Sequence, residues 1–126
     1  MSEPAPALHP VEAEIMDVVW DRGEVSVRDV MEALNAAAAK PRAYTTVMTM
    51  LGRLHAKAMV TRRREGKTDV YAPAHTRDEY ADLRAQAEVA ALVDTFGDAA
   101  LIHFAKQVAE LDPARRKAIQ RLARGS

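Results

Sequence analysis

Residues 40–73 read KPRAYTTVMTMLGRLHAKAMVTRRREGKTDVYAP, and this stretch decides the fold. Its first part has the apolar spacing of a helix that runs from about residue 43 to residue 58. Two short β-prone runs follow at 60–65 and 68–72. The Gly-Lys pair between these runs is typical of a tight hairpin turn. We therefore expect a helix followed by a two-stranded antiparallel ribbon.

The predicted helix has two different sides when its residues are placed on a helical wheel. The apolar side, which we expect to face the core, consists of Val47, Met50, Leu51 and Leu54. The opposite side and its flanks consist of Thr45, Thr46, Met48, Thr49, Gly52, Arg53, Ala56 and Lys57. A solvated helix would be rich in Glu and Lys, whereas no acidic residue occurs between Lys40 and Arg64. The outer side is thus small, hydroxylated and basic.

An outer side of this kind meets the requirements of the DNA major groove. Small side chains let a helix approach the base edges, and threonine can hydrogen-bond to a base or a phosphate. Arg53 is long enough to reach a guanine edge or a phosphate, and Lys57 extends the basic surface. The alternative is a helix that is merely exposed to solvent.

The ribbon adds four cations that we expect to contact phosphates, namely Arg62, Arg63, Arg64 and Lys67. Successive side chains of a strand point to opposite faces, so at most two of the three arginines can reach one row of phosphates. The formal net charge of zero hides a balance of −6 over residues 1–39, +7 over 40–68 and −1 over 69–126. This local excess favours a polyanionic partner, and the alternative is a solvated basic surface.

Two further helices are expected on the N-terminal side of this stretch. Pro10 can begin the first helix, and Gly23 ends it after an apolar stripe. Ser26 and Asp29 form an acidic variant of the capping box, so a second helix is expected to begin there. Residues 1–75 therefore predict three helices and a ribbon, which is a winged helix-turn-helix whose third helix faces outward.

Residues 76–126 predict three more helices with thin, alanine-rich apolar faces. Capping signals at Thr76, Asp98 and Asp112 mark where these helices begin, and Gly97 ends the first of them. About fifty residues of this kind are too few for an independent core. We therefore expect a helical interface with a second copy of the chain, the alternative being that these helices only pack on the N-terminal part. The expected interface residues are Tyr80, Leu83, Leu92, Phe96, Leu101, Phe104, Val108, Ile119 and Leu122.

Composition argues against several other classes of protein. Hydrophobic residues make up 48% of the chain, but 25 of them are alanine and only 5% of all residues are aromatic, which favours helices. The absence of cysteine excludes disulfides, iron–sulfur clusters and thiolate zinc sites. The glycines are isolated and the four histidines lie at least twenty residues apart, so no phosphate-binding loop or metal pair is expected. We expect neither an enzyme nor a bound cofactor or metal.

The chain is also expected to be a soluble, cytoplasmic protein. No stretch approaches the roughly 18 consecutive apolar residues that a membrane span needs. The acidic, proline-rich N-terminus lacks the basic region and apolar core of a signal peptide.

Three stretches resemble the penicillinase-repressor (BlaI/MecI/CopY) family of winged-helix transcriptional regulators. They are LHPVEAEIMDVVW at 8–20, YTTVMTMLGRL at 44–54 and VYAP at 70–73. The resemblance is good over residues 8–75 and extends over the remainder only in its helix pattern. It implies a repressor that dimerises through its C-terminal helices and binds a palindromic operator through its winged domain. The family's DNA-contacting positions map onto Thr46, Thr49 and Arg53, with Tyr44 and Thr45 at the helix start.

The chain departs from the family at three points. In antibiotic-resistance members a membrane-bound sensor metalloprotease triggers cleavage of an Asn-Phe bond, and the nearest counterpart here is Thr95-Phe96, without the Asn. The copper-responsive members carry a C-terminal cysteine cluster, which this chain cannot supply. Ala58 occupies the place of the family's usual glycine after the recognition helix, where a left-handed alanine would cost about 1 kcal/mol.

Two other functions remain open on the sequence alone. A winged-helix module for protein–protein contact would carry large apolar side chains on the outer side of the third helix, where Met48 is the only one. A ligand-sensing regulator of another family would enclose a pocket, and the small number of aromatic residues argues against a roomy one.

Overall fold

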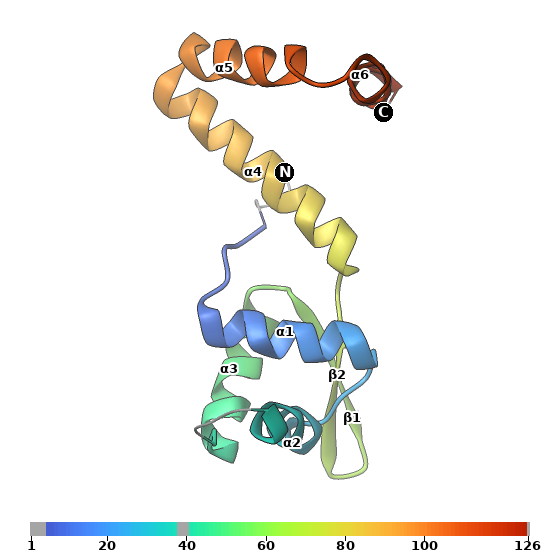
Figure 1. Ribbon diagram of the computed structural model, residues 1–126. Coiled ribbons are helices and arrows are strands. Elements are labelled where there is room, and N and C mark those ends of the chain that lie inside the picture. Colours follow the sequence, from blue (N-terminus) through green and yellow to red (C-terminus); the bar gives the residue numbers. More distant parts are fainter. Residues whose placement is uncertain (1–4, 38–40, 126) are drawn as a thin grey trace. The chain divides into compact units, whose positions relative to one another are not determined.

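The computed structural model describes residues 5–37 and 41–125 (Figure 1). The chain forms two compact units, Met1–Arg84 and Ala85–Ser126. Its elements are α1 (Pro10–Arg22), α2 (Val27–Ala37), α3 (Tyr44–Ala56), β1 (Val60–Glu65), β2 (Thr68–Pro73), α4 (Arg77–Phe96), α5 (Asp98–Ala109) and α6 (Pro113–Gly125). The element order up to β2 is that of a winged helix-turn-helix, as the sequence predicts. Within the described residues, no helix combines the length and the apolar character needed to cross a bilayer.

The core of the first unit lies among α1, α2, α3 and the ribbon. Val47, Leu51 and Leu54 are buried and Met50 is half-buried, so the predicted core side of α3 is confirmed. Burial of a large aliphatic side chain stabilises a fold by about 1.5–3 kcal/mol. The buried hydrophobic residues are Ile15, Met16, Val19, Val25, Val27, Val30, Val47, Leu51, Leu54, Met59, Val60 and Tyr71.

Two reciprocal capping boxes mark where α2 and α4 begin. The backbone N–H of Ser26 donates to the Asp29 carboxylate at 3.0 Å, and the N–H of Asp29 donates to the Ser26 hydroxyl at 3.1 Å. Thr76 and Glu79 make the same exchange at 2.8 and 3.0 Å. Both boxes were predicted, and each satisfies N–H groups that a helix start would otherwise leave unpaired.

The start of α5 differs from the expectation. Gly97, with a φ of 63°, is the N-cap residue, and Asp98 is the first residue of the helix rather than its cap. The turn between α4 and α5 needs a left-handed residue, which glycine adopts at little cost. Asp112 does act as expected, because its carboxylate accepts the N–H of Arg115 at 3.0 Å.

The ribbon pairs in an antiparallel register that places Arg62 opposite Tyr71 and Arg64 opposite Asp69. Val25, in the turn between α1 and α2, also pairs with Tyr71, through N···O distances of 2.9 and 2.7 Å. The segment that connects α1 to α2 is thereby joined to β2. This bridge was not expected from the sequence, and it fixes the base of the wing to the helical core.

Ala58 joins α3 to β1 in the left-handed conformation that was expected, with a φ of 62°. Its N–H donates to the carbonyl of His55 at 3.0 Å, and the N–H of Met59 donates to the carbonyl of Leu54 at 2.9 Å. These two bonds are the Schellman pattern, in which glycine is the usual left-handed residue. The helix end is therefore well hydrogen-bonded but strained at one alanine.

The first turns of α4 lie against α1. The indole N–H of Trp20 donates to the carbonyl of His75 at 2.8 Å, and the guanidinium of Arg77 lies 5.3 Å from the centre of the Trp20 ring. The ring of Tyr80 packs beside Trp20 at 5.7 Å, and its hydroxyl donates to the carbonyl of Pro6. The N-terminal arm, α1 and the start of α4 thus share one contact region.

Candidate nucleic-acid interface

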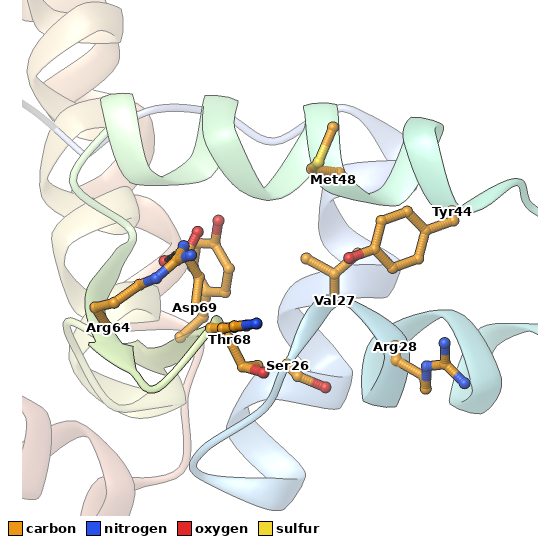
Figure 2. Close-up of a pocket in the computed structure, with 10 residues that line it drawn as sticks. Ser26, Val27, Arg28, Tyr44, Met48, Arg64, Thr68 and Asp69 are labelled. Atoms are coloured by element: carbon orange, nitrogen blue, oxygen red, sulfur yellow. Dashed lines mark hydrogen bonds and ion pairs between the residues drawn. The ribbon is translucent and has the colours of Figure 1, made fainter.

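A groove of about 480 Å³ opens between the first turns of α2, the first turns of α3 and the wing (Figure 2). Its lining residues are Ser26, Val27, Arg28, Tyr44, Met48, Arg64, Lys67, Thr68, Asp69 and Tyr71. Three of them are cations and one is an acid, so the groove has a net positive lining. Sequence reasoning missed Arg28, because its position at the start of α2 gives no sign of the wing beside it. A concave, cationic surface of this kind fits a phosphate backbone.

The outer side of α3 is exposed as the sequence predicts. Tyr44, Thr45, Thr46, Thr49 and Arg53 all lie on the surface of this helix. Arg53 makes no ion pair with another described residue, and α3 itself contains no acidic residue. The exposed surface of α3 can therefore approach an anionic ligand without a repelling charge of its own.

Lys57 departs from its expected place on this surface. It is the C-cap residue of α3, and its ammonium group donates to both carboxylate oxygens of Glu12 at 2.8 and 2.9 Å. Glu12 has no exposed surface and also accepts the N–H of His9 at 2.9 Å. The side chain of Lys57 is therefore directed towards Glu12 of α1.

The environment of Glu12 favours its ionised form. Burial by itself raises the pKa of this carboxyl group, since it removes water from the charge. The hydrogen bonds from Lys57 and His9, together with the positive charge of Lys57, outweigh burial and hold the pKa below its ordinary value. The Glu12 carboxyl group is therefore ionised at neutral pH.

Arg63 lies on the opposite face of the wing from Arg62 and Arg64, because successive strand residues alternate. It donates to both carboxylate oxygens of Glu24 at 3.0 Å and to Glu65 at 2.7 Å. The hydrogen bond to Glu24, followed by that to Glu65, raises the pKa of Arg63, and the pairing lowers the pKa of Glu24. Arg63, an expected phosphate contact, is thus paired with the turn after α1 in this structure.

Arg62 and Arg64 share the face of the ribbon that carries Tyr71 and Asp69. Arg64 lines the groove and pairs with Asp69 at 3.1 Å, while Arg62 is exposed. The expectation that at most two of the three arginines face one way agrees with this register. Lys67 in the hairpin turn lies on the rim of the same groove.

The second unit exposes large apolar side chains of α4, α5 and α6. Phe96 is 61% exposed and Leu122 is 74% exposed, with Leu92, Leu101 and Ile102 also on the surface. Phe104, Val108 and Ile119 are half-buried. A cleft of about 380 Å³ is lined by Leu92, Phe96, Ala99, Ala100, His103 and Phe104. Ile102 was missed as a surface residue, since it lies off the expected apolar stripe of α5.

Two of the expected interface residues lie in the first unit, and the expected cleavage bond lies inside a helix. Tyr80 and Leu83 belong to the first unit, where the ring of Tyr80 packs on Trp20 within the same chain. Thr95 and Phe96 are the last two residues of α4, so their peptide bond is part of a helix. Among the described residues, no three His, Asp or Glu side chains gather into a group that could hold a metal ion.

Comparison with known sequences gives one family. The penicillinase repressor family matches residues 8–124. The transcriptional regulator BlaI of Mycobacterium tuberculosis is 42% identical over 118 residues, which covers 91% of this chain and 84% of the relative. The penicillinase repressor of Bacillus licheniformis is 28% identical over 80 residues, covering 63% of this chain and 60% of the relative.

Solved structures give the same result for the fold. The DNA-binding domain of the repressor BlaI has a TM-score of 0.53 at 26% identity, covering 63% of this chain and 94% of the domain. The monomeric form of Bacillus licheniformis BlaI in complex with the blaP half-operator has a TM-score of 0.50 at 28% identity. The match covers 60% of this chain and 90% of the solved chain. The chain therefore belongs to the penicillinase repressor (BlaI/MecI/CopY) family of winged-helix transcriptional regulators.

Proposed function

We propose that this chain is a transcriptional repressor that binds a palindromic DNA operator as a homodimer. In this proposal α3 enters the major groove, and the wing lies along the phosphate backbone. The observation that carries the proposal is the acid-free outer surface of α3 beside a cationic groove. The relative solved in complex with a half-operator supports the same role for this surface.

The contacts divide between bases and phosphates. We assign the reading of base edges to the exposed residues Thr45, Thr46, Thr49 and Arg53, with Tyr44 beside them in the lining of the groove. The phosphate contacts fall to the cations of the groove and the wing, which are Arg28, Arg62, Arg64 and Lys67. Each phosphate neutralised on B-DNA adds about 0.9 to the slope of log affinity against log salt.

The dimer is proposed to form through residues 76–126, and residues 1–75 are proposed to bind DNA. Exposed large apolar side chains in a single chain are typical of a surface that is covered by a partner. Symmetric dimers are the commonest oligomers, and two-fold symmetry would match a palindromic operator. The two α3 helices would then meet major grooves one helical turn, about 34 Å, or a small multiple apart.

The test is DNA binding measured against salt. Duplexes selected from a random library by the full chain are labelled and titrated by fluorescence anisotropy, with a scrambled duplex as the control. We expect tighter binding to the selected duplex and a steep loss of affinity as salt rises. A slope near zero, or equal affinity for both duplexes, would overturn the proposal.

The variant Arg53→Ala distinguishes a base contact of this residue from a phosphate contact. If Arg53 reads a base edge, the variant loses about 1–3 kcal/mol of binding on the selected duplex only. An equal loss on the scrambled duplex would instead assign Arg53 to a phosphate. Because its side chain is exposed, the free energy of unfolding should stay within about 0.5 kcal/mol of the parent value.

The family resemblance also gives a membrane-bound sensor metalloprotease as a candidate partner. The Thr95–Phe96 bond lies in the last turn of α4, where the N–H of Gly97 still donates to Val93 at 2.7 Å. A protease cuts an extended segment, so cleavage here would need this turn to unwind. The intact mass of the chain, measured after co-expression with such a protease, tests this partnership. A chain of unchanged mass would contradict it.

A further inference from the structure

Two large hydrophobic side chains interrupt the polar surface at the start of α3. Tyr44 and Met48 are each 46% exposed, and their spacing of four residues places them on the same side of the helix. Among the described residues of the first unit, no other large hydrophobic side chain is exposed. Both line the groove beside the wing. Folding alone gives no reason for apolar side chains at these two positions.

The surroundings of Met48 point to the kind of ligand that would cover it. Arg28, Arg64 and Lys67 line the same groove with one acid, Asp69, so its net positive charge favours an occupant that is anionic along one edge and apolar at another. Gly52 follows one turn later, and a Cβ placed there would meet no atom within 4 Å. The surface beyond Met48 is therefore open to close approach by a flat ligand.

A DNA duplex has both properties in its major groove. The phosphates supply the anionic edge, and the C5-methyl of thymine is the one apolar group that a standard base presents there. The thioether of Met48 has no donor and only a weak acceptor, so it cannot read the polar edge of a base. Its flexible, polarisable chain is suited to packing on a methyl group.

We infer that Met48, with Tyr44 beside it, packs on the C5-methyl of a thymine in each half-site of the operator. Met48 is then a specificity-determining residue that acts through apolar contact and not through hydrogen bonds. This inference rests on the proposed DNA binding and adds to it a base identity at one position.

The experiment removes the methyl group from the DNA and the thioether from the protein. In the duplex selected by the full chain, each thymine is replaced in turn by deoxyuridine, which differs from thymine only by the C5-methyl group. For the parent chain we expect one thymine position in each half-site at which the replacement weakens binding about fourfold, the effect of burying one methyl group. At other thymine positions the affinity should stay unchanged.

Met48→Ala and Met48→Leu, each measured on the thymine and the deoxyuridine duplexes, show whether the methyl preference depends on this side chain. Met48→Ala should bind thymine and deoxyuridine equally at the sensitive position, while Met48→Leu should keep the preference. Circular dichroism and the unfolding midpoint establish that both variants are folded, as expected for an exposed side chain. A parent chain with no methyl-sensitive position, or a Met48→Ala chain that keeps the preference, would overturn the inference and leave the DNA binding intact. A parent chain that selects no duplex would overturn the proposed function itself, and this inference with it.

Discussion

Lys57 donates hydrogen bonds to both carboxylate oxygens of Glu12, at 2.8 and 2.9 Å, and so joins the end of α3 to the first turn of α1. Glu12 is the only charged side chain that is fully buried among residues 5–37 and 41–125. A buried carboxylate is costly without a partner, so this pair fixes where α3 ends and where the wing begins. We therefore expect the position of α3 relative to α1 to depend on this pair.

Lys57→Met should therefore destabilise the fold although the side chain lies at the edge of the molecule. The change leaves the Glu12 carboxylate uncompensated, and we expect a loss of about 3 kcal/mol, the lower end of the range because Lys57 is still 30% exposed. Urea unfolding followed by circular dichroism measures this loss. Lys67→Met makes the same chemical change in the exposed hairpin turn and should stay within about 0.5 kcal/mol. Equal effects of the two changes would contradict the role of the pair.

The stability of the fold should decrease in acid partly through Glu12. Its pKa in the folded state lies below the ordinary value of about 4.3, so the stabilisation is complete above that value and is lost as the pH falls through the folded pKa. The free energy of unfolding of the parent chain should therefore decrease more steeply below about pH 4 than that of Glu12→Gln. The difference between the two curves isolates Glu12 from other carboxylates such as Glu24 and Glu79, whose pKa values are also lowered. Parallel curves would mean that Glu12 does not titrate as the geometry implies.

The two faces of the wing should differ in their effect on DNA binding. Arg62→Ala and Arg64→Ala should each reduce the salt slope by about one unit, because each removes one phosphate contact. Arg63→Ala removes the same charge from the opposite face, where the guanidinium pairs with Glu24 and Glu65, and should leave the slope unchanged. Anisotropy titrations at a series of salt concentrations give all three slopes. A smaller slope for Arg63→Ala than for Arg62→Ala would reverse the assignment of faces.

Much of the first unit follows from the sequence because its signals are local. The period of Val47, Leu51 and Leu54 predicts the buried side of α3, and Ser26 with Asp29 predicts where α2 begins. Each of these signals depends on residues within one or two turns of each other. Such patterns survive in any tertiary arrangement that buries the same side.

The contacts that were not predicted are those between segments far apart in the chain. Lys57 and Glu12 are 45 residues apart, and their pairing depends on how α1 crosses α3. Arg63 meets Glu24 across 39 residues, since the wing folds back onto the turn after α1. Arg28 likewise lines the groove because the wing, which is distant in sequence, lies beside the start of α2. Helical and strand periodicity give the direction of a side chain from its own element, but not which element lies opposite.

Ala58→Gly should stabilise the chain. The residue has a φ of 62°, which glycine adopts without the steric cost that alanine incurs, and we expect a gain of about 1 kcal/mol. The thermal midpoint should rise accordingly. Ala56→Gly, two residues earlier in the last helical turn, introduces the same residue at a helical position and should not stabilise. A fall in the midpoint for Ala58→Gly would show that the left-handed alanine carries no strain.

Leu101→Asp should separate the proposed dimer. Leu101 is 50% exposed on α5, and burying a carboxylate in an apolar interface should weaken association by at least about tenfold. Sedimentation velocity at micromolar concentration distinguishes monomer from dimer. Lys106→Asp places an aspartate on the opposite side of the same helix and should leave the dimer intact. An unchanged sedimentation coefficient for Leu101→Asp would exclude this side of α5 from the interface.

The chain contains a single tryptophan, and its position gives the molecule a built-in optical probe. Trp20 contacts the guanidinium of Arg77 and the ring of Tyr80, and its indole N–H donates to the carbonyl of His75. All tryptophan emission therefore comes from the contact between α1 and the start of α4. A shift in the wavelength of that emission would signal that α4 has come away from α1, in a titration or a stopped-flow trace, without a dye or an added label.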